Sequence, residues 1–332
     1  MPERATIAQG VQIGVEVTPG TAVPAPIQLL SMGFSPAPQA EFTSFRPMGL
    51  KYPTIQALVR EWSEAPIEGY PTYNEIVYPL NGVLVATTPT VANVAVQRWT
   101  FDPASASEDT VKTFTIERGG AVQAERVANG IITAFNLGFT RTAAPTMGGT
   151  MMGKQMETGI TMTAAPTGLD LVPMLPGQVS VFLNDTFGAL GTTKLTRLLS
   201  WNWALSNRFG PEWVLDDALD SFVTHVELEP TNEIEILVQA NSTGMAILEA
   251  ARNGDKKWLQ MVATSNRMIP GTTPSTPYSF TFKAAVEVGG IGPLSDSDGV
   301  YAGQYTLRVT HDATWGQAYQ VIVDNDVEDL TP

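Results

Sequence analysis

Apolar and polar residues alternate along most of this chain, and this alternation limits the possible folds more than any other feature. Val11, Ile13 and Val15 are each separated by one residue, as on a strand whose two faces meet different environments. The same spacing recurs in segments 114–116, 131–139, 223–228, 234–238, 280–282 and 305–309. Because 29 Gly and 24 Pro favour turns and interrupt helices, the sequence predicts a mainly β fold.

Two short stretches carry a helical pattern instead. The first runs from Tyr73 to Leu80 and is followed by Asn81-Gly82, and the second runs from Thr243 to Arg252 and is followed by Asn253-Gly254. Asn and Gly tolerate the left-handed backbone conformation that ends many helices. We therefore expect two short helices, each ending at an Asn-Gly pair.

The two halves of the chain align with each other in order. The aligned positions are Val11, Ile13 and Val15 with Val179, Val181 and Leu183, then Leu29-Leu30-Ser31 with Leu198-Leu199-Ser200, and finally Phe114 with Phe280. We interpret this as duplication, giving two tandem β-sandwich or β-barrel units, each with a short flanking helix. The alternative is two unrelated β-rich domains.

The predicted boundaries follow from this repeat. The first β domain with an N-terminal arm covers residues 1–163, and a Pro- and Gly-rich linker covers 164–177. The second β domain covers 178–325, and an acidic C-terminal tail covers 326–332.

Charge and cysteine content exclude several classes of function. Against 33 Asp and Glu there are only 19 Lys and Arg, so the net charge is −14. No basic run is present to bind nucleic acid through its phosphates. Cys is absent, which excludes disulfides, thiolate nucleophiles and Cys-based metal sites. No stretch approaches the ~20 apolar residues that span a bilayer, and no signal peptide is expected, so we expect no membrane contact.

The residues that usually carry chemistry do not form a recognisable site. His225 and His311 are the only histidines, and no Gly-x-Ser-x-Gly turn accompanies them. The carboxylates Asp216, Asp217, Asp220, Glu227 and Glu229 are interpreted as solvated side chains. We therefore predict that the chain is not an enzyme and has no catalytic residues.

Metal and cofactor motifs fail in the same way. Asp296 to Gly299 suggests a calcium loop, but Leu294 and Tyr305 then occupy positions that need carboxylates. No phosphate-binding loop is formed by the glycines Gly138, Gly148, Gly149 and Gly153. The Met-rich run Met147 to Met156 is interpreted as a mobile loop or interface. We predict no metal and no cofactor.

Three segments resemble the tail tube proteins of long, non-contractile-tailed bacteriophages, the siphophage tail tube family. The first is Val11-Gln12-Ile13-Gly14-Val15-Glu16-Val17-Thr18-Pro19-Gly20-Thr21-Ala22-Val23, a strand followed by a Glu and a Thr-x-Gly-Thr turn. The second is Tyr70-Pro71-Thr72-Tyr73-Asn74-Glu75 before a helix, and the third runs from Trp203 to Trp213 before Asp216-Asp217.

This resemblance implies a structural protein of the virion tail, assembled in the host cytoplasm. Rings of such proteins stack into a tube, and DNA passes through the channel without specific binding. Six copies of the fold per ring would correspond to three duplicated chains, or to six chains if the halves are unrelated. The implied partners are other copies of this chain, a tail tip or initiator complex, a tape measure protein and a terminator protein.

Stacking of rings requires segments that reach a neighbour. The candidates are residues 1–10, the Pro-rich loop Ser35 to Gln39, the long loop Ala143 to Gly159 and the acidic tail Asp324 to Pro332. The acidic excess is expected to line the channel, so that Lys in place of luminal Asp or Glu would slow DNA ejection.

Two other classes of function remain open. One is a different virion ring or decoration protein, such as a tail terminator or a capsid decoration protein. The other is a carbohydrate-binding β-sandwich using the tryptophans Trp99, Trp201, Trp203, Trp213, Trp258 and Trp315.

Overall fold

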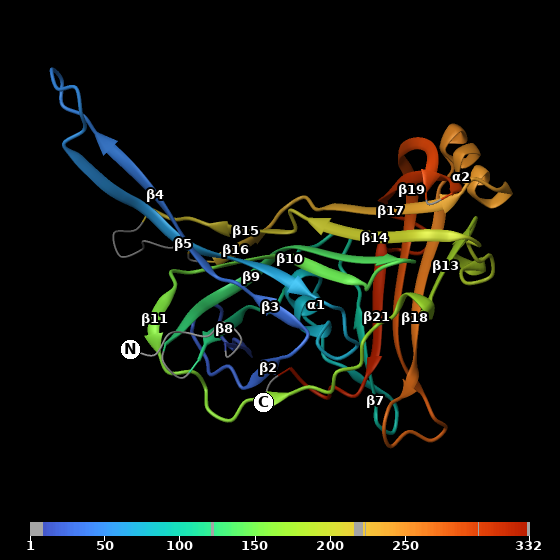
Figure 1. Ribbon diagram of the computed structural model, residues 1–332, viewed down its shortest axis with the longest axis horizontal. Helices are drawn as coiled ribbons and strands as arrows, with labels where there is room; N and C mark the ends of the chain where they lie inside the picture. Colours follow the sequence, from blue (N-terminus) through green and yellow to red (C-terminus); the bar gives the residue numbers. More distant parts are fainter. Residues whose placement is uncertain (1–8, 121–122, 216–221, 223, 298, 331–332) are drawn as a thin grey trace.

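The computed structural model describes residues 9–120, 123–215, 222, 224–297 and 299–330, and it is mainly β as predicted (Figure 1). The first half contains β1 (Gly10–Val15), β2 (Ile27–Leu29), β3 (Met32–Phe34), β4 (Ala37–Phe45), β5 (Ile55–Gly69), α1 (Val77–Val83), β6 (Thr90–Asn93), β7 (Val96–Phe101), β8 (Phe114–Gly119), β9 (Ala124–Thr140), β10 (Thr146–Gly153), β11 (Glu157–Ile160) and β12 (Thr167–Gly168). The second half contains β13 (Val179–Asn184), β14 (Leu198–Ser206), β15 (Phe209–Glu212), β16 (Thr224–Glu227), β17 (Thr231–Gln239), α2 (Ser242–Asn253), β18 (Lys257–Met268), β19 (Pro277–Ser297), β20 (Val300–Val309) and β21 (Tyr319–Asn325).

One antiparallel sheet runs through both halves. Its central strands follow one another in the order β5–β10–β9–β14–β17–β20–β19. The halves meet where β9 pairs with β14, from Phe135 opposite Leu205 to Thr140 opposite Ser200. A second junction joins β7 of the first half to β21 of the second.

The longest strands, β9 and β19, each take part in two layers. The first part of β9 pairs with β8 and β11, whereas its second part pairs with β10 and β14. The change occurs near Asn129, whose φ of 55° lies in the left-handed region and bends the strand. In the same way, the first part of β19 pairs with β18 and β21, and its second part pairs with β20.

The same pattern of strand pairing therefore occurs in both halves. In the first half, the hairpin β4–β5 precedes α1, β5 pairs with β10, and β10 pairs with β9. In the second half, β14–β17 precedes α2, β17 pairs with β20, and β20 pairs with β19. The outer layers match as well, because β1–β8–β9 corresponds to β13–β18–β19. The division into two domains stays a prediction.

The two helices lie near the predicted positions, but only one ends as predicted. α2 begins after Asn241, whose side chain accepts hydrogen bonds from Thr243 N and Gly244 N, and it ends at Gly254 with φ 68°. α1 continues through Asn81 to Val83, so the predicted stop there is wrong. The reason is tertiary packing: Asn81 and Gly82 are both buried, and the Asn81 side chain is held by Val77 O and Thr87 N, so the helix continues past the pair.

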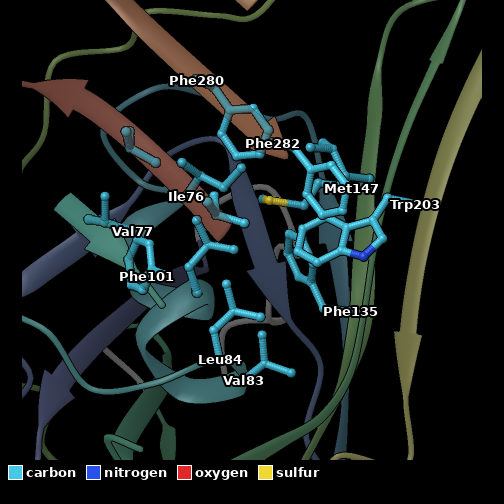
Figure 2. Close-up of a cluster of buried hydrophobic side chains, with 14 of the residues drawn as sticks. Ile76, Val77, Val83, Leu84, Phe101, Phe135, Met147, Trp203, Phe280 and Phe282 are labelled. Carbon is cyan, nitrogen blue, oxygen red and sulfur yellow. The ribbon is translucent and has the colours of Figure 1, made fainter. Parts of the chain in front are cut away.

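The core is a single cluster that takes side chains from both halves. Figure 2 shows Ile76, which directly precedes α1, and Val83, which lies within it. Both face Phe135 of β9 and Trp203 of β14. Every residue of α1 is buried. The Phe135 and Trp203 rings meet edge-on with centroids 5.6 Å apart, which ties the β9–β14 junction into the core.

Three segments predicted as reaching arms or loops are structured differently. Segment 35–39 leads into β4, and segment 143–159 contains β10 and the start of β11, because both find pairing partners distant in sequence. Met147 and Met151 are core residues of β10, so the predicted mobile Met-rich loop is wrong. The predicted acidic tail packs against the core, because Val327 and Leu330 are buried and the Asp326 carboxylate accepts a hydrogen bond from Tyr278 Oη. Residues 1–8 lie outside the described residues.

The predicted linker, residues 164–177, lies against the first half. β12 pairs in parallel with β2, and Pro173 forms an isolated bridge with Thr72. Val172 and Met174 are buried there.

Candidate assembly surfaces

A long hairpin formed by β4 and β5 projects from the body of the molecule (Figure 1). Its outer part carries large apolar side chains that no other described part of the chain covers. They are Phe42, Phe45, Met48, Leu50, Tyr52, Ile55, Leu58 and Val59, each at least 45% exposed. We call residues 42–59 of this hairpin the arm tip. An apolar surface of this kind on a projecting element indicates contact with another molecule.

The arm tip is also basic in an acidic protein. Arg46 and Lys51 lie within it, and no Asp or Glu occurs between Glu41 and Glu61. The chain as a whole carries a net charge of −14. A second copy of this chain would therefore attract the arm tip electrostatically.

The base of the arm is braced by a cation between two aromatic rings. The guanidinium carbon of Arg60 lies 5.6 Å from the Trp62 ring centroid and 5.0 Å from that of Trp213. Arg60 Nε also donates to Glu41 across the hairpin at 2.6 Å. Trp213 follows β15, so the small β15–β16 hairpin helps to set the direction of the arm.

The central sheet has one face in the core and one face that the described residues leave without a covering layer, which we call the bare face. A row of paired residues crosses it: Glu68, Gly148, Asn136, Ala204, Glu233, Arg308 and Glu287. The next row is Thr146, Gly138, Asn202, Glu235, Thr306 and Gly290. None of these residues is buried, whereas their strand neighbours Leu137, Trp203 and Ile234 are.

The chemistry of the bare face is small, polar and acidic. Its charged residues in these rows are Glu68, Glu233, Glu235 and Glu287 against Arg308, whose Nε donates to Glu233 at 3.1 Å. Gly138 sits where an added Cβ would lie 3.1 Å from Thr146 Oγ1 and 3.2 Å from Asn202 Oδ1. The backbone at Gly138 therefore lies close to side chains of both neighbouring strands, and the acidic excess makes the face repel polyanions.

Glu16, which lies just before the Thr-x-Gly-Thr turn, connects three segments of the first half through its side chain. Its buried carboxylate accepts four hydrogen bonds, from Gly20 N, Thr113 Oγ1, Thr115 Oγ1 and Asn129 N, at 2.8–2.9 Å. The motif thus joins the end of β1 to β8 and to the bend of β9.

Glu75 of the second motif plays a similar part before α1. Its buried carboxylate accepts from Leu30 N at 2.7 Å and from Ser31 N at 3.0 Å. This fixes β2 and the start of β3 against the helix. The sequence pattern did not indicate either role, because a buried carboxylate with backbone donors has no signature of its own.

A buried ionic cluster was missed by the sequence reading. Arg208, 4% exposed, donates to both Asp109 and Glu227, and Asp109 N donates to Glu227 at 2.7 Å. The interpretation of Glu227 as a solvated side chain is therefore wrong. The cluster holds the loop between β7 and β8 against β15 and β16 of the second half.

The remaining predicted candidates are not brought together. His225 lies in β16 with its ring edge-on to Phe209, and burial lowers its pKa. His311 follows β20, and its carbonyl accepts from Lys256. Asp296 accepts from Gly299 N in the β19–β20 turn. Asp216, Asp217 and Asp220 lie outside the described residues.

The described part of the chain holds no group of three or more His, Asp or Glu placed to bind a metal. Trp99, Trp201 and Trp203 are buried in the core, so they offer no ring face to a sugar. Trp315 stacks on Phe187 with ring centroids 4.8 Å apart. In the described residues, neither helix has the length and apolar character needed to cross a membrane.

Comparison with known proteins gives little. No protein-family model matches the sequence, and no curated protein sequence matches it. Among solved structures, the chain is similar to the SPP1 tail tube determined by solid-state NMR and cryo-electron microscopy. The identity is 11% and the TM-score 0.30, over 48% of this chain and 82% of that chain. A TM-score this low does not establish a shared fold.

Proposed function

We propose that the chain is a structural subunit of a tail tube in the virion of a long-tailed bacteriophage, assembled from copies of itself in the host cytoplasm. The observation that carries the proposal is the arm. A projecting hairpin with an apolar, basic tip finds no partner among the described residues of its own chain, and an acidic copy of the same chain offers one. The arm tip contacts a copy in the next ring.

The bare face supports the assignment of a channel. A sheet with one face in the core and a small-residue, acidic face outside fits a wall past which DNA moves without binding. The strands from β5 to β19 line the channel in this proposal. The partners include a tail tip complex, a tape measure protein and a terminator, and a ring contains three chains if the halves are duplicates.

Negative-stain electron microscopy and native mass measurement over a concentration series test the proposal. Wild-type protein is expected to form hollow tubes of uniform width. The double variant Arg46→Glu with Lys51→Glu is expected to stop at single rings or monomers, because the arm tip then carries the charge of its acceptor.

The matched control changes net charge equally but away from the arm. Arg118→Glu with Arg252→Glu replaces two positive charges by two negative charges, as the arm variant does, and is expected to form tubes as the wild type does. Tube formation by the Arg46→Glu, Lys51→Glu variant would contradict the proposed contact of the arm tip with another copy. Isolated rings from the wild type would favour a terminator or decoration protein instead.

Charge reversal on the bare face tests the channel. Glu68→Lys with Glu235→Lys is expected to leave tube formation intact and to slow DNA ejection from particles, since cations would bind passing phosphates. An unchanged ejection rate would contradict the placement of the bare face at the channel.

A further inference from the structure

The central sheet has two unpaired edges, one in each half. Among the described residues, β3 and β4 pair only with β5, and β19 from Glu287 onward pairs only with β20. Unpaired edges expose backbone donors and acceptors that a neighbouring strand can satisfy.

The chain already contains one junction of the type these edges could form. Within the chain, β9, the last strand of the first half's order β4–β5–β10–β9, pairs antiparallel with β14. The second half has the matching strand order β14–β17–β20–β19. Comparing the two orders position by position, β4 of the first half corresponds to β14, and β9 corresponds to β19. The junction equivalent to β9–β14 would therefore join β19 to β4, and within one chain these strands lie at opposite ends of the sheet.

We propose that the second half of β19 in one copy pairs antiparallel with β3 and the start of β4 in a second copy, so that the bare faces of neighbouring copies form one continuous surface. This rests on the proposed function and deepens it by naming the lateral contact. Because the two edges differ, the contact is head-to-tail, which closes into a ring when the rotation fits.

The side chains at the two edges are compatible. Residues 287–297 contain Glu287 and Asp296 and no Lys or Arg, and residues 32–40 of β3 and the start of β4 contain no charged residue. Ile291 is 52% exposed on the β19 edge. The pairing therefore brings no like charges together and covers an exposed apolar side chain.

Cross-linking tests the contact, and the absence of Cys makes every introduced thiol unique. Ala37→Cys on β4 and Ser295→Cys on β19 are both at exposed positions. Equimolar single variants, assembled together and treated with a short bis-maleimide, are expected to shift about half of the monomer band to a covalent dimer, because in a mixed head-to-tail ring half of the Ala37→Cys copies meet a Ser295→Cys neighbour at that edge. The double variant is expected to give a ladder that ends at the closed ring.

Two controls interpret the result. Val91→Cys on β6, another exposed edge position, combined with Ser295→Cys is expected to stay monomeric. Asn136→Cys with Ala204→Cys, directly opposite at the β9–β14 junction, is expected to cross-link within the chain. Assembled particles in which this internal pair reacts but Ala37→Cys and Ser295→Cys do not would overturn the β19–β4 contact alone. Failure of the wild type to assemble at all would overturn the proposed function as well.

Discussion

Replacing Glu16 by Gln tests whether the Thr-x-Gly-Thr motif acts through its buried carboxylate. One oxygen accepts from Gly20 N and Thr113 Oγ1, and the other accepts from Asn129 N and Thr115 Oγ1. The hydroxyls can rotate to accept from an amide, but a backbone N–H cannot. In either orientation, the Gln amide group therefore faces one backbone N–H that loses its acceptor.

The magnitude follows from these contacts. An unsatisfied buried N–H costs about 1–3 kcal/mol, and hydrogen bonds to a neutral acceptor are roughly half as strong as those to a carboxylate. We expect Glu16→Gln to lower the free energy of unfolding by about 2–4 kcal/mol, given that one donor is lost and the others weaken. Urea denaturation followed by tryptophan fluorescence measures the change.

The matched control is Glu212→Gln, because Glu212 is exposed in β15 and its loss should change stability by less than about 0.5 kcal/mol. A stability of Glu16→Gln equal to or above that of the wild type would refute the reasoning. It would mean that the cost of burying the charge exceeds what its hydrogen bonds return.

Three further changes are expected to alter stability. Burial lowers the pKa of His225, so the folded state favours its neutral imidazole. The resulting contribution to the free energy of unfolding is fully present above the unfolded-state pKa and is lost as pH falls through the folded-state pKa. His225→Leu should therefore flatten the fall in melting temperature over that pH range. Deleting residues 326–332 removes Val327 and Leu330 from the core and should cost about 3–6 kcal/mol in urea unfolding, whereas a dispensable tail would cost nothing. Gly254→Ala forces a Cβ into φ 68° at the end of α2 and should cost about 1 kcal/mol, while Gly188→Ala, with open space around its Cα, should be neutral by the same assay.

The sequence predicted elements whose signals are local. Alternation located strands such as β1 and β17, and Asn253-Gly254 correctly marked the end of α2 because the C-cap depends on that residue's own backbone freedom. Asn81-Gly82 misled because a tertiary environment buries both residues and keeps them helical. Local propensity was overridden there by packing.

The assembly surfaces were mostly beyond sequence reasoning. Segments 35–39 and 143–159 appeared as loops because Pro38 and the glycines of β10 are poor strand formers, and pairing with β5 and β9 places much of them in β4 and β10. The bare face depends on which residues of different strands stand in one row, and no single segment encodes that register. Aligning Phe114 with Phe280 shows the same limit, because the pairing pattern matches β8 with β18 and not with β19.

The two unpaired edges explain how such a chain could remain single before it assembles. Pro38 lies on the β4 edge and Pro293 on the β19 edge, and neither has a backbone N–H to donate. Each edge therefore presents an interrupted row of donors, which weakens random edge-to-edge pairing. Pairing of β19 with β4 therefore depends on the side chains beside the two edges as well as on backbone hydrogen bonds. A foreign strand would meet the same prolines without side chains matched to either edge, so the pairing favours copies of this chain.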